Sequence, residues 1–199
     1  MIAAMEAFLP SIDETRPPRD AALLAGCRAG DRSAFEELYR VHGERMKSVA
    51  ANLLGDRAEA EDAVQEAFVR IFRSSASFEG RSRFSTWIYR VVVNCCYDLL
   101  RRRRPTISLE EAPLESGEPL AGIAGSPDPA LRRALDQGLA TLPPRQRSAF
   151  VLFAVEGFSH REISEILDVS PGNSKTLVFE AKRRLARLLE PRLRSPRSA

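Results

Sequence analysis

The sequence predicts an all-α protein built of two small helical domains joined by a flexible acidic linker. Apolar residues recur at spacings of three and four from residue 21 to about residue 104, and again from residue 130 to about residue 189, as in amphipathic helices. No segment alternates polar and apolar residues over the length of a strand. Residues 105–129 hold five prolines, three glycines and no lysine or arginine, a composition typical of a linker. We therefore expect a flexible arm at 1–20, domains at 21–104 and 130–192, and a tail at 193–199.

The first long helix is predicted to run from Asp31, which is placed to cap it, to Gly55, which is placed to end it. Its residues share one apolar face that should be buried. That face comprises Phe35, Leu38, Tyr39, His42, Met46, Val49, Ala50 and Leu53.

The next helix is predicted to begin at Asp56, a capping residue, with acidic side chains near its positive N-terminus. Its apolar stripe should be buried and comprises Val64, Ala67, Phe68, Ile71 and Phe72. The opposite stripe should face solvent and comprises Asp62, Gln65, Glu66, Val69 and Arg73.

A further helix is predicted after a loop at 74–83, capped by Ser85 and ended by Pro105. We expect its buried side to hold Ile88, Val91, Val92, Cys95 and Leu99. Its exposed side should hold Arg90, Asn94, Tyr97, Asp98 and Arg101. A run of four arginines, residues 101–104, follows and could meet a polyanion, although cations also stabilise a helix C-terminus.

The second domain carries the pattern of a DNA-binding helix-turn-helix. Pro144 suits the first turn of one helix, Gly157 ends the apolar segment after it, and Ser159 is placed to cap a short helix. After a turn at 168–169, Ser170 and Pro171 begin a long helix that ends in basic residues, which is the helix-turn-helix arrangement. The inner side should hold Val178, Ala181, Leu185 and Leu188. The groove-facing side should hold Asn173, Thr176, Leu177, Glu180, Arg184 and Arg187. An ordinary helical hairpin in a bundle is the alternative.

Several classes of protein are disfavoured by the composition. The two histidines, His42 and His160, lie far apart, and we find neither a phosphate-binding glycine loop nor a metal-ligand spacing, so we expect no catalysis, metal or cofactor. Three cysteines make no disulfide framework, which favours a reducing cytoplasm. No apolar run approaches the roughly 20 residues of a membrane span, and the N-terminus does not resemble a signal peptide.

Four motifs together resemble the extracytoplasmic-function subgroup of the sigma-70 family of bacterial RNA polymerase sigma factors. Residues 61–70 (EDAVQEAFVR) look like the polymerase-binding helix, and residues 78–90 (FEGRSRFSTWIYR) look like the promoter-melting segment. Residues 142–147 (LPPRQR) and 157–163 (GFSHREI) resemble the second domain of the same subgroup. The order and spacing of these motifs in one short chain make the resemblance specific.

The resemblance implies a role for each segment. Asp62, Gln65 and Glu66, with Val69 beside them, match residues that bind the clamp helices of the large polymerase subunit. The minus-ten element and its melting would involve Phe84, Trp87, Tyr89, Asn94, Asp98, Arg101 and Arg102. Stacking on an unpaired base suits the aromatic residues, although Trp87 and Tyr89 could equally belong to the core. The minus-thirty-five element would be contacted by Asn173, Lys175, Thr176, Leu177, Glu180 and Arg184.

The resemblance also implies partners and leaves alternatives open. Members of the subgroup are often held inactive by an anti-sigma factor, which is frequently membrane-anchored, and their linker threads through the polymerase. Leu177 and Glu180 depart from the family, which usually carries basic residues there. A helix-turn-helix regulator acting without polymerase, and an interaction module that has lost DNA binding, remain the rival hypotheses.

Overall fold

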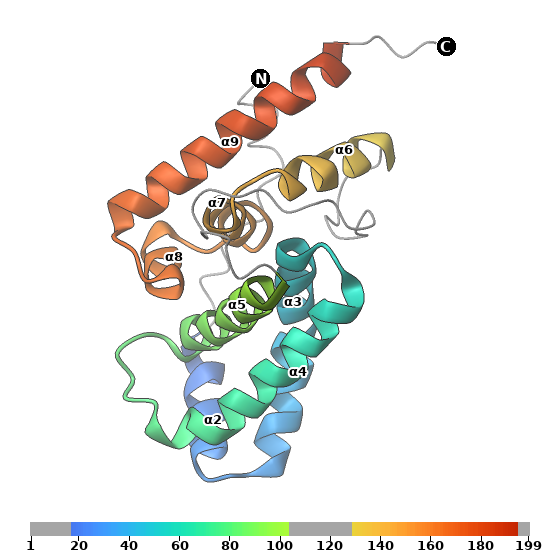
Figure 1. Cartoon of the computed structure of the whole chain (residues 1–199). Helices are drawn as coiled ribbons and strands as arrows, with labels where there is room; N and C mark the ends of the chain where they lie inside the picture. The colour runs from blue at the N-terminus through green and yellow to red at the C-terminus, as the bar shows by residue number, and fades with distance from the viewer. Residues whose placement is uncertain (1–16, 104–128, 195–199) are drawn as a thin grey trace.

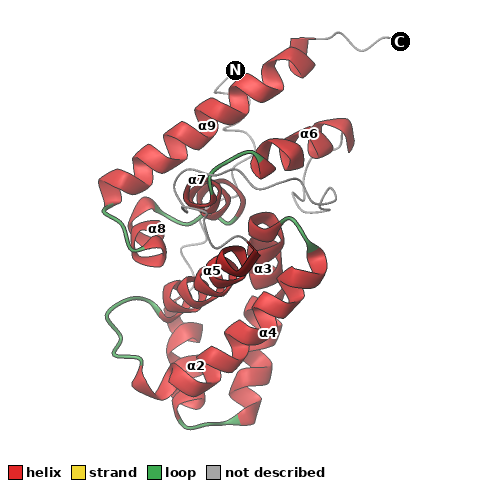
Figure 2. Cartoon of the chain, in the orientation of Figure 1, coloured by secondary structure: helices red, strands yellow, loops and turns green. Residues whose placement is uncertain are grey.

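The computed structural model describes residues 17–103 and 129–194, and all of the regular structure in them is helical (Figures 1 and 2). The predicted linker at 105–129, except Pro129, lies outside the described residues, as do the tail after Arg194 and most of the predicted arm. The elements are α2 (Pro17–Arg28), α3 (Arg32–Leu54), α4 (Arg57–Ser74), the 3₁₀ turn η1 (Ser75–Ser77), α5 (Phe84–Arg103), α6 (Pro129–Ala140), α7 (Pro144–Phe150), the π-helical η2 (Val151–Val155), α8 (His160–Leu167) and α9 (Pro171–Arg194).

Local signals for helix ends are confirmed at several positions. Asp31 accepts a hydrogen bond from the Ser33 amide at 2.9 Å, and Gly55 ends α3 in the left-handed region at φ 73°. Asp56 accepts from the Glu59 amide at 2.9 Å and so caps α4. These ends depend on side chains within one turn, so they can be predicted from the sequence.

Two predicted helix starts are wrong. The first helix begins at Pro17, four residues before the expected Ala21, because Pro17 and Pro18 suit a first turn that needs no amide donors. Ser85 does not cap α5, which already begins at Phe84; Ser85 is a buried helical residue instead. The Trp87 amide donates to the Arg83 carbonyl at 3.0 Å, which places the start of the helix ahead of Ser85.

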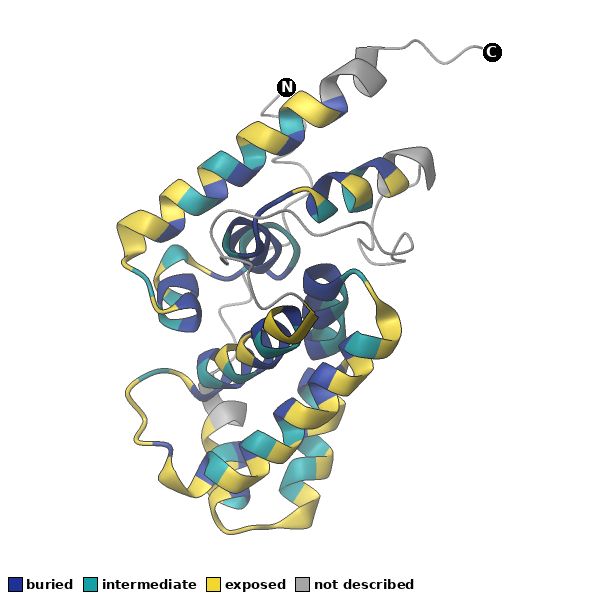
Figure 3. Cartoon of the chain, viewed as in Figure 1, coloured by how far each residue is buried: buried dark blue, intermediate teal, exposed yellow. Residues whose placement is uncertain are grey.

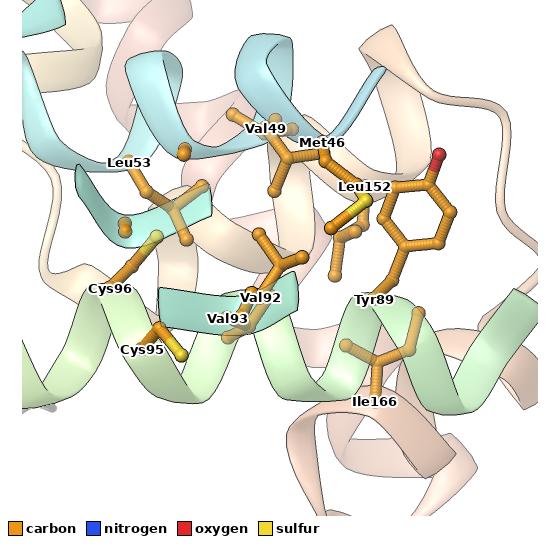
Figure 4. Packing of buried hydrophobic residues seen from close by; sticks show 14 of the residues in the cluster. Met46, Val49, Leu53, Tyr89, Val92, Val93, Cys95, Cys96, Leu152 and Ile166 are labelled. Carbon is orange, nitrogen blue, oxygen red and sulfur yellow. The ribbon is translucent and has the colours of Figure 1, made fainter. Parts of the chain in front are cut away.

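The first domain consists of α2, α3, α4 and α5 packed against one another, and the second of α6 to α9, in which α7 and α8 pack against α9. Helix α5 also contacts α8, so it lies between the two domains (Figure 1). One hydrophobic cluster runs across both domains and includes Met46 of α3, Val92 of α5 and Ile166 of α8 (Figure 4). The dark, buried residues lie on the faces that the helices turn toward one another, and the exposed residues, in yellow, lie on the outward faces (Figure 3).

The contact between domains buries a face of α5 that the sequence analysis expected to be exposed. Tyr97 is only 5% exposed, and its hydroxyl group lies 2.8 Å from Ser148 Oγ of α7 in a hydrogen bond. The ring of Tyr89 meets that of Phe158, from the second domain, edge-on at 4.9 Å. Burial raises the pKa of the Tyr97 phenol to about 12. The predicted exposure of Tyr97 is therefore wrong, because α5 carries a second apolar stripe that the second domain covers.

Arg147 of α7 crosses the junction with its guanidinium group buried. Its Nη1 donates to the carbonyl of Leu53 at 2.9 Å, and its Nε donates to the carbonyl of Leu139 at 2.6 Å. Both carbonyls lie in the last turn of a helix, α3 and α6 respectively, and the Leu139 carbonyl also accepts from the Leu142 amide at 3.1 Å. Burial lowers the pKa of Arg147 to about 9, so the group stays charged at neutral pH and complements two helix C-termini.

A second buried cation, Arg45, also joins the two domains. Arg45 of α3 forms an ion pair with Glu156 at 2.7 Å, and the Glu156 side chain is only 5% exposed. The same guanidinium lies 5.6 Å from the ring centroid of Tyr89 and 5.4 Å from that of Phe158. The two domains therefore meet through buried charge as well as apolar contact.

Candidate polymerase-binding and nucleic-acid interfaces

The predicted polymerase-binding residues lie together on one exposed stripe of α4. Asp62, Gln65, Glu66 and Val69 are all exposed, while Ala63, Val64 and Ala67 of the same helix are buried. The cap at Asp56 and the apolar contact with α3 set the rotation of the helix, and this rotation turns the stripe outward.

The stripe continues into an apolar patch that the sequence analysis missed. Phe72 is 58% exposed and Tyr39 is 49% exposed, although both were predicted to be buried. The rings of Tyr39 and Phe68 lie 5.2 Å apart, and those of Phe35 and Phe72 lie 4.8 Å apart, so the patch spans α3 and α4. The spacing from Gln65 through Val69 to Phe72 places Phe72 at the edge where the exposed stripe meets the buried one, which was the available signal. We call Tyr39, Val69 and Phe72 the α3–α4 patch.

Two of the aromatic residues predicted to contact the minus-ten element are in the core. Phe84 is 4% exposed and Tyr89 is fully buried, so neither can stack on a base in this arrangement. Trp87 is half-buried, and its ring centroid lies 5.0 Å from that of Phe78 and 5.6 Å from that of Phe84. Phe84 and Tyr89 are buried because α5 has apolar contacts on more than one side.

Trp87 and Asn94 meet at a hollow between α4 and α5 of about 350 Å³. Asn94 is exposed and offers both donor and acceptor atoms at the rim. The hollow is lined by Arg70, Arg73, Ser74, Trp87, Val91 and Asn94. An indole face, an amide and two guanidinium groups can together accept a planar polar group that carries phosphate.

Asp98 is held by two arginines. Arg70 Nη1 donates to its Oδ2 at 2.9 Å, and Arg101 Nη1 donates to its Oδ1 at 3.1 Å. Arg70 Nε also donates to Glu66 Oε1 at 2.8 Å, and these hydrogen bonds raise the pKa of Arg70. Within the basic run, Arg101, Arg102 and Arg103 are all exposed, and Arg103 also donates to the Leu54 carbonyl at 3.2 Å.

The predicted helix-turn-helix is formed by α8 and α9. Ser159 and Glu162 form a capping box at the start of α8, and Asp168 adopts the left-handed conformation at its end, with φ 55°. Ser170 Oγ accepts from the Asn173 amide at 3.1 Å and caps α9. His160 Nδ1 lies 3.1 Å from Ser174 Oγ, which links the beginnings of the two helices.

The outward face of α9 differs in part from the predicted one. Asn173, Lys175, Thr176 and Arg184 are exposed, as a groove-facing surface requires. Leu177 is half-buried against the core, and Glu180 accepts a hydrogen bond from Gln146 Nε2 at 2.7 Å. The two departures from the family therefore have contacts inside the domain.

Two hydrophobic residues of α9 are exposed. The Phe179 side chain is 65% exposed and lies on the turn after Thr176; its exposure was not predicted from the sequence. Leu188 is 47% exposed and not buried as predicted.

The three cysteines are buried as thiols. Burial raises the pKa of Cys27 and of Cys95 to about 11, and it raises the pKa of Cys96 as well. Within 17–103 and 129–194, histidine, cysteine and acidic side chains form no cluster able to hold a metal ion, and no helix there is long and apolar enough to cross a bilayer.

Comparison with known proteins matches both domains to one family. The model of sigma-70 region 2 matches residues 38–106, and that of sigma-70 region 4 matches residues 132–185. The ECF RNA polymerase sigma factor SigM of Mycobacterium tuberculosis is 37% identical over 172 residues, which cover 85% of this chain and 84% of that protein. This chain belongs to the extracytoplasmic-function subgroup of the sigma-70 family. It is thus a promoter-specific initiation factor that binds core RNA polymerase and promoter DNA.

Other relatives agree with this assignment. RNA polymerase sigma factor CarQ of Myxococcus xanthus is 32% identical over 162 residues, covering 81% of this sigma factor and 92% of that protein. The fold resembles that of CnrH, solved in complex with the cytosolic domain of CnrY, with a TM-score of 0.67 and 24% identity over 87% of this chain and 98% of that one. The hypothesis of a regulator acting without polymerase finds no support in these matches.

Proposed function

We propose that the exposed stripe of α4, extended by the α3–α4 patch, is the surface on which this sigma factor binds the clamp helices of the large polymerase subunit. The observation that carries the proposal is the exposure of Val69, Phe72 and Tyr39 next to the polar stripe. A contiguous apolar patch rimmed by polar side chains is the usual composition of a protein interface.

For the minus-ten element, we propose that Asn94 reads an unpaired base at the α4–α5 hollow, with Trp87 available for stacking. Arg101 and Arg102 are exposed at the C-terminal end of α5 and are suited to hold the adjacent phosphates. Phe84 and Tyr89 are left out of this site because they are buried.

For the minus-thirty-five element, we propose that α9 enters the major groove with Asn173, Lys175, Thr176 and Arg184. Phe179 joins this surface, since an apolar side chain can contact the methyl group of thymine. We propose that Glu180 makes a contact within the domain and does not contact DNA, because its carboxylate already accepts a hydrogen bond from Gln146.

We infer that the two promoter elements are not bound together while the domains are packed against each other. Elements centred near minus ten and minus thirty-five lie about 25 base pairs apart, which is roughly 85 Å of duplex at 3.4 Å per base pair. Helix α9, with 24 residues, is only about 36 Å long. We therefore propose that residues 21–104 and 130–192 act as separate domains on the promoter, and that the junction opens when polymerase binds.

We propose the remaining parts of the function by analogy with the family. The sigma factor itself catalyses no reaction and uses no cofactor or metal, and it acts in the cytoplasm where its polymerase is. An anti-sigma factor, either membrane-anchored or not, is a further partner; the sigma factor RpoE of Bartonella quintana, which is similar in fold, was solved in complex with the anti-sigma factor NepR. The α3–α4 patch would offer such a partner apolar area.

Paired variants test the assignment of the two surfaces. Replacing Asp62 and Gln65 together by Ala should weaken core-polymerase binding by roughly tenfold in a fluorescence titration, since interface residues at a contact centre contribute on that scale. Asn94→Ala should leave that affinity unchanged but reduce permanganate-detected opening of the promoter at saturating core enzyme. The proposal is refuted if the double variant binds core enzyme as the wild type does.

A further inference from the structure

Four charged side chains connect the polymerase-binding stripe of α4 to the basic end of α5. Glu66 Oε1 accepts from Arg70 Nε at 2.8 Å, and Arg70 Nη1 donates to Asp98 Oδ2 at 2.9 Å. Arg101 Nη1 then donates to Asp98 Oδ1 at 3.1 Å. Charges alternate along this row, so Arg70 and Asp98 each bond two partners of opposite charge.

Arg70 is the member that joins the two helices. Its guanidinium group presents separate N–H donors in a rigid plane, so it can bond a carboxylate on its own helix and another on α5 at the same time. The Arg70 and Asp98 side chains are each 35% exposed, so water weakens the attraction between their charges only in part. The neighbouring pair of Arg57 and Glu61, at 3.6 Å, lies entirely on α4 and is more exposed.

Asp98 does not have the geometry of a base-reading residue. Each of its two oxygens already accepts from a guanidinium group. A carboxylate would also repel the phosphates beside any base that it read. Its evident effect is to hold Arg101, an exposed cation at the end of α5, away from other anions.

We propose that Arg70 is a positioning residue that couples polymerase binding at Glu66 to DNA binding by Arg101. When polymerase engages Glu66, Arg70 loses one of its carboxylates and pairs more strongly with Asp98. Asp98 then holds Arg101 less strongly, and Arg101 is released toward the phosphates of the minus-ten element. The inference rests on the proposed function, because it takes Glu66 as part of the polymerase surface.

A charge-matched pair of variants tests this proposal. Glu66→Gln removes the carboxylate that polymerase would occupy, and Glu61→Gln makes the same change in net charge on an α4 residue whose pair does not reach α5. The assay is binding of the free full-length sigma factor to a single-stranded oligonucleotide carrying a mapped minus-ten element, over a series of salt concentrations.

Glu66→Gln should bind the oligonucleotide about two- to fivefold more tightly than Glu61→Gln, which is the range that one exposed ion pair supplies. The salt dependence of its affinity should be steeper by about the amount that one additional phosphate contact gives. Arg70→Ala should abolish the gain when combined with Glu66→Gln. Equal affinities for the two Gln variants would overturn the proposal, because a row that only braces α4 against α5 would not distinguish them.

Polymerase titrations separate this inference from the proposed function. Saturating oligonucleotide should tighten binding of the wild type to core enzyme, and by reciprocity this tightening should be about two- to fivefold smaller in Arg70→Ala. If the Ala variant unfolds, Arg70→Lys replaces it in the test, because Lys keeps the positive charge. Arg70→Lys should lose part of the coupling because Lys lacks the planar guanidinium group. If coupling is unchanged while the Asp62 and Gln65 double variant still weakens core binding, the inference fails and the proposed function stands.

Discussion

Replacing Arg147 by Met should destabilise the junction between the two domains. Met is also long and unbranched, but it lacks the guanidinium group. The change therefore removes two hydrogen bonds, to the carbonyls of Leu53 at 2.9 Å and Leu139 at 2.6 Å. Both carbonyls lie in the last turn of their helices, and that of Leu139 also accepts from the Leu142 amide at 3.1 Å. The variant therefore removes the hydrogen bond that the Leu53 carbonyl receives from the other domain, and it leaves the Leu139 carbonyl with only its bond from the Leu142 amide.

The magnitude follows from two opposing contributions. A hydrogen bond from a charged donor stabilises the folded state by about 1.5–3 kcal/mol, so the two bonds contribute about 3–6 kcal/mol. Burying the guanidinium costs several kcal/mol, and Met does not have this cost. We expect a net loss of about 2–3 kcal/mol, which lowers the melting temperature of a protein of this size by roughly 5–10 °C.

Thermal unfolding followed by circular dichroism measures this loss. Arg161→Met is the matched control, because the Arg161 side chain is 88% exposed and its pair with Glu165, at 3.7 Å, lies within α8. The control should melt within about 1 °C of the wild type. If Arg147→Met melts with the control, the carbonyls of α3 and α6 do not depend on Arg147 and the account of the junction is wrong.

Three further outcomes are expected. Glu156→Gln removes the carboxylate that pairs with Arg45 and leaves only the bond to the Glu156 carbonyl, so small-angle scattering should show a larger radius of gyration; an unchanged radius would exclude that ion pair as a closing contact. Phe179→Ala should weaken binding to minus-thirty-five duplexes by about three- to tenfold without changing core affinity; equal affinity for the duplex would remove Phe179 from the DNA surface. Burial and the cations Lys175 and Lys182 lower the pKa of His160 below 6.5, so the folded state binds this proton more weakly than the unfolded chain. Stability should fall as the pH drops below about 6.5, and His160→Gln should reduce that fall in melting curves; an identical pH profile would contradict it.

Much of the secondary structure could be predicted because it depends on neighbouring residues. Asp31 and Asp56 bond amides two and three residues ahead, and Ser159 and Glu162 satisfy each other across one turn. The exposure of Asp62 and Gln65 also follows from helical spacing, since the buried stripe of α4 lies on its opposite side.

The errors concern residues whose burial depends on a distant element. Tyr97 has the spacing of an exposed residue on α5, but Ser148 of α7 accepts its hydrogen bond. Phe72 has the spacing of a residue at the edge of the buried stripe of α4, and the ring of Phe35 covers it only in part. Spacing within one helix shows how residues are grouped, but it cannot show how wide the covering surface is.

The sequence by itself determined the family, the all-helical class and the grouping of residues on α4 and α9, because motifs and helical periods are local properties of the chain. Only the tertiary structure decided that α5 is covered by the second domain, that Arg147 caps two helices, and that Asp98 is shared by Arg70 and Arg101. These contacts join residues far apart in the sequence, in the case of Arg147 and Leu53 by 94 positions. Their geometry depends on how whole helices pack, which no short segment encodes.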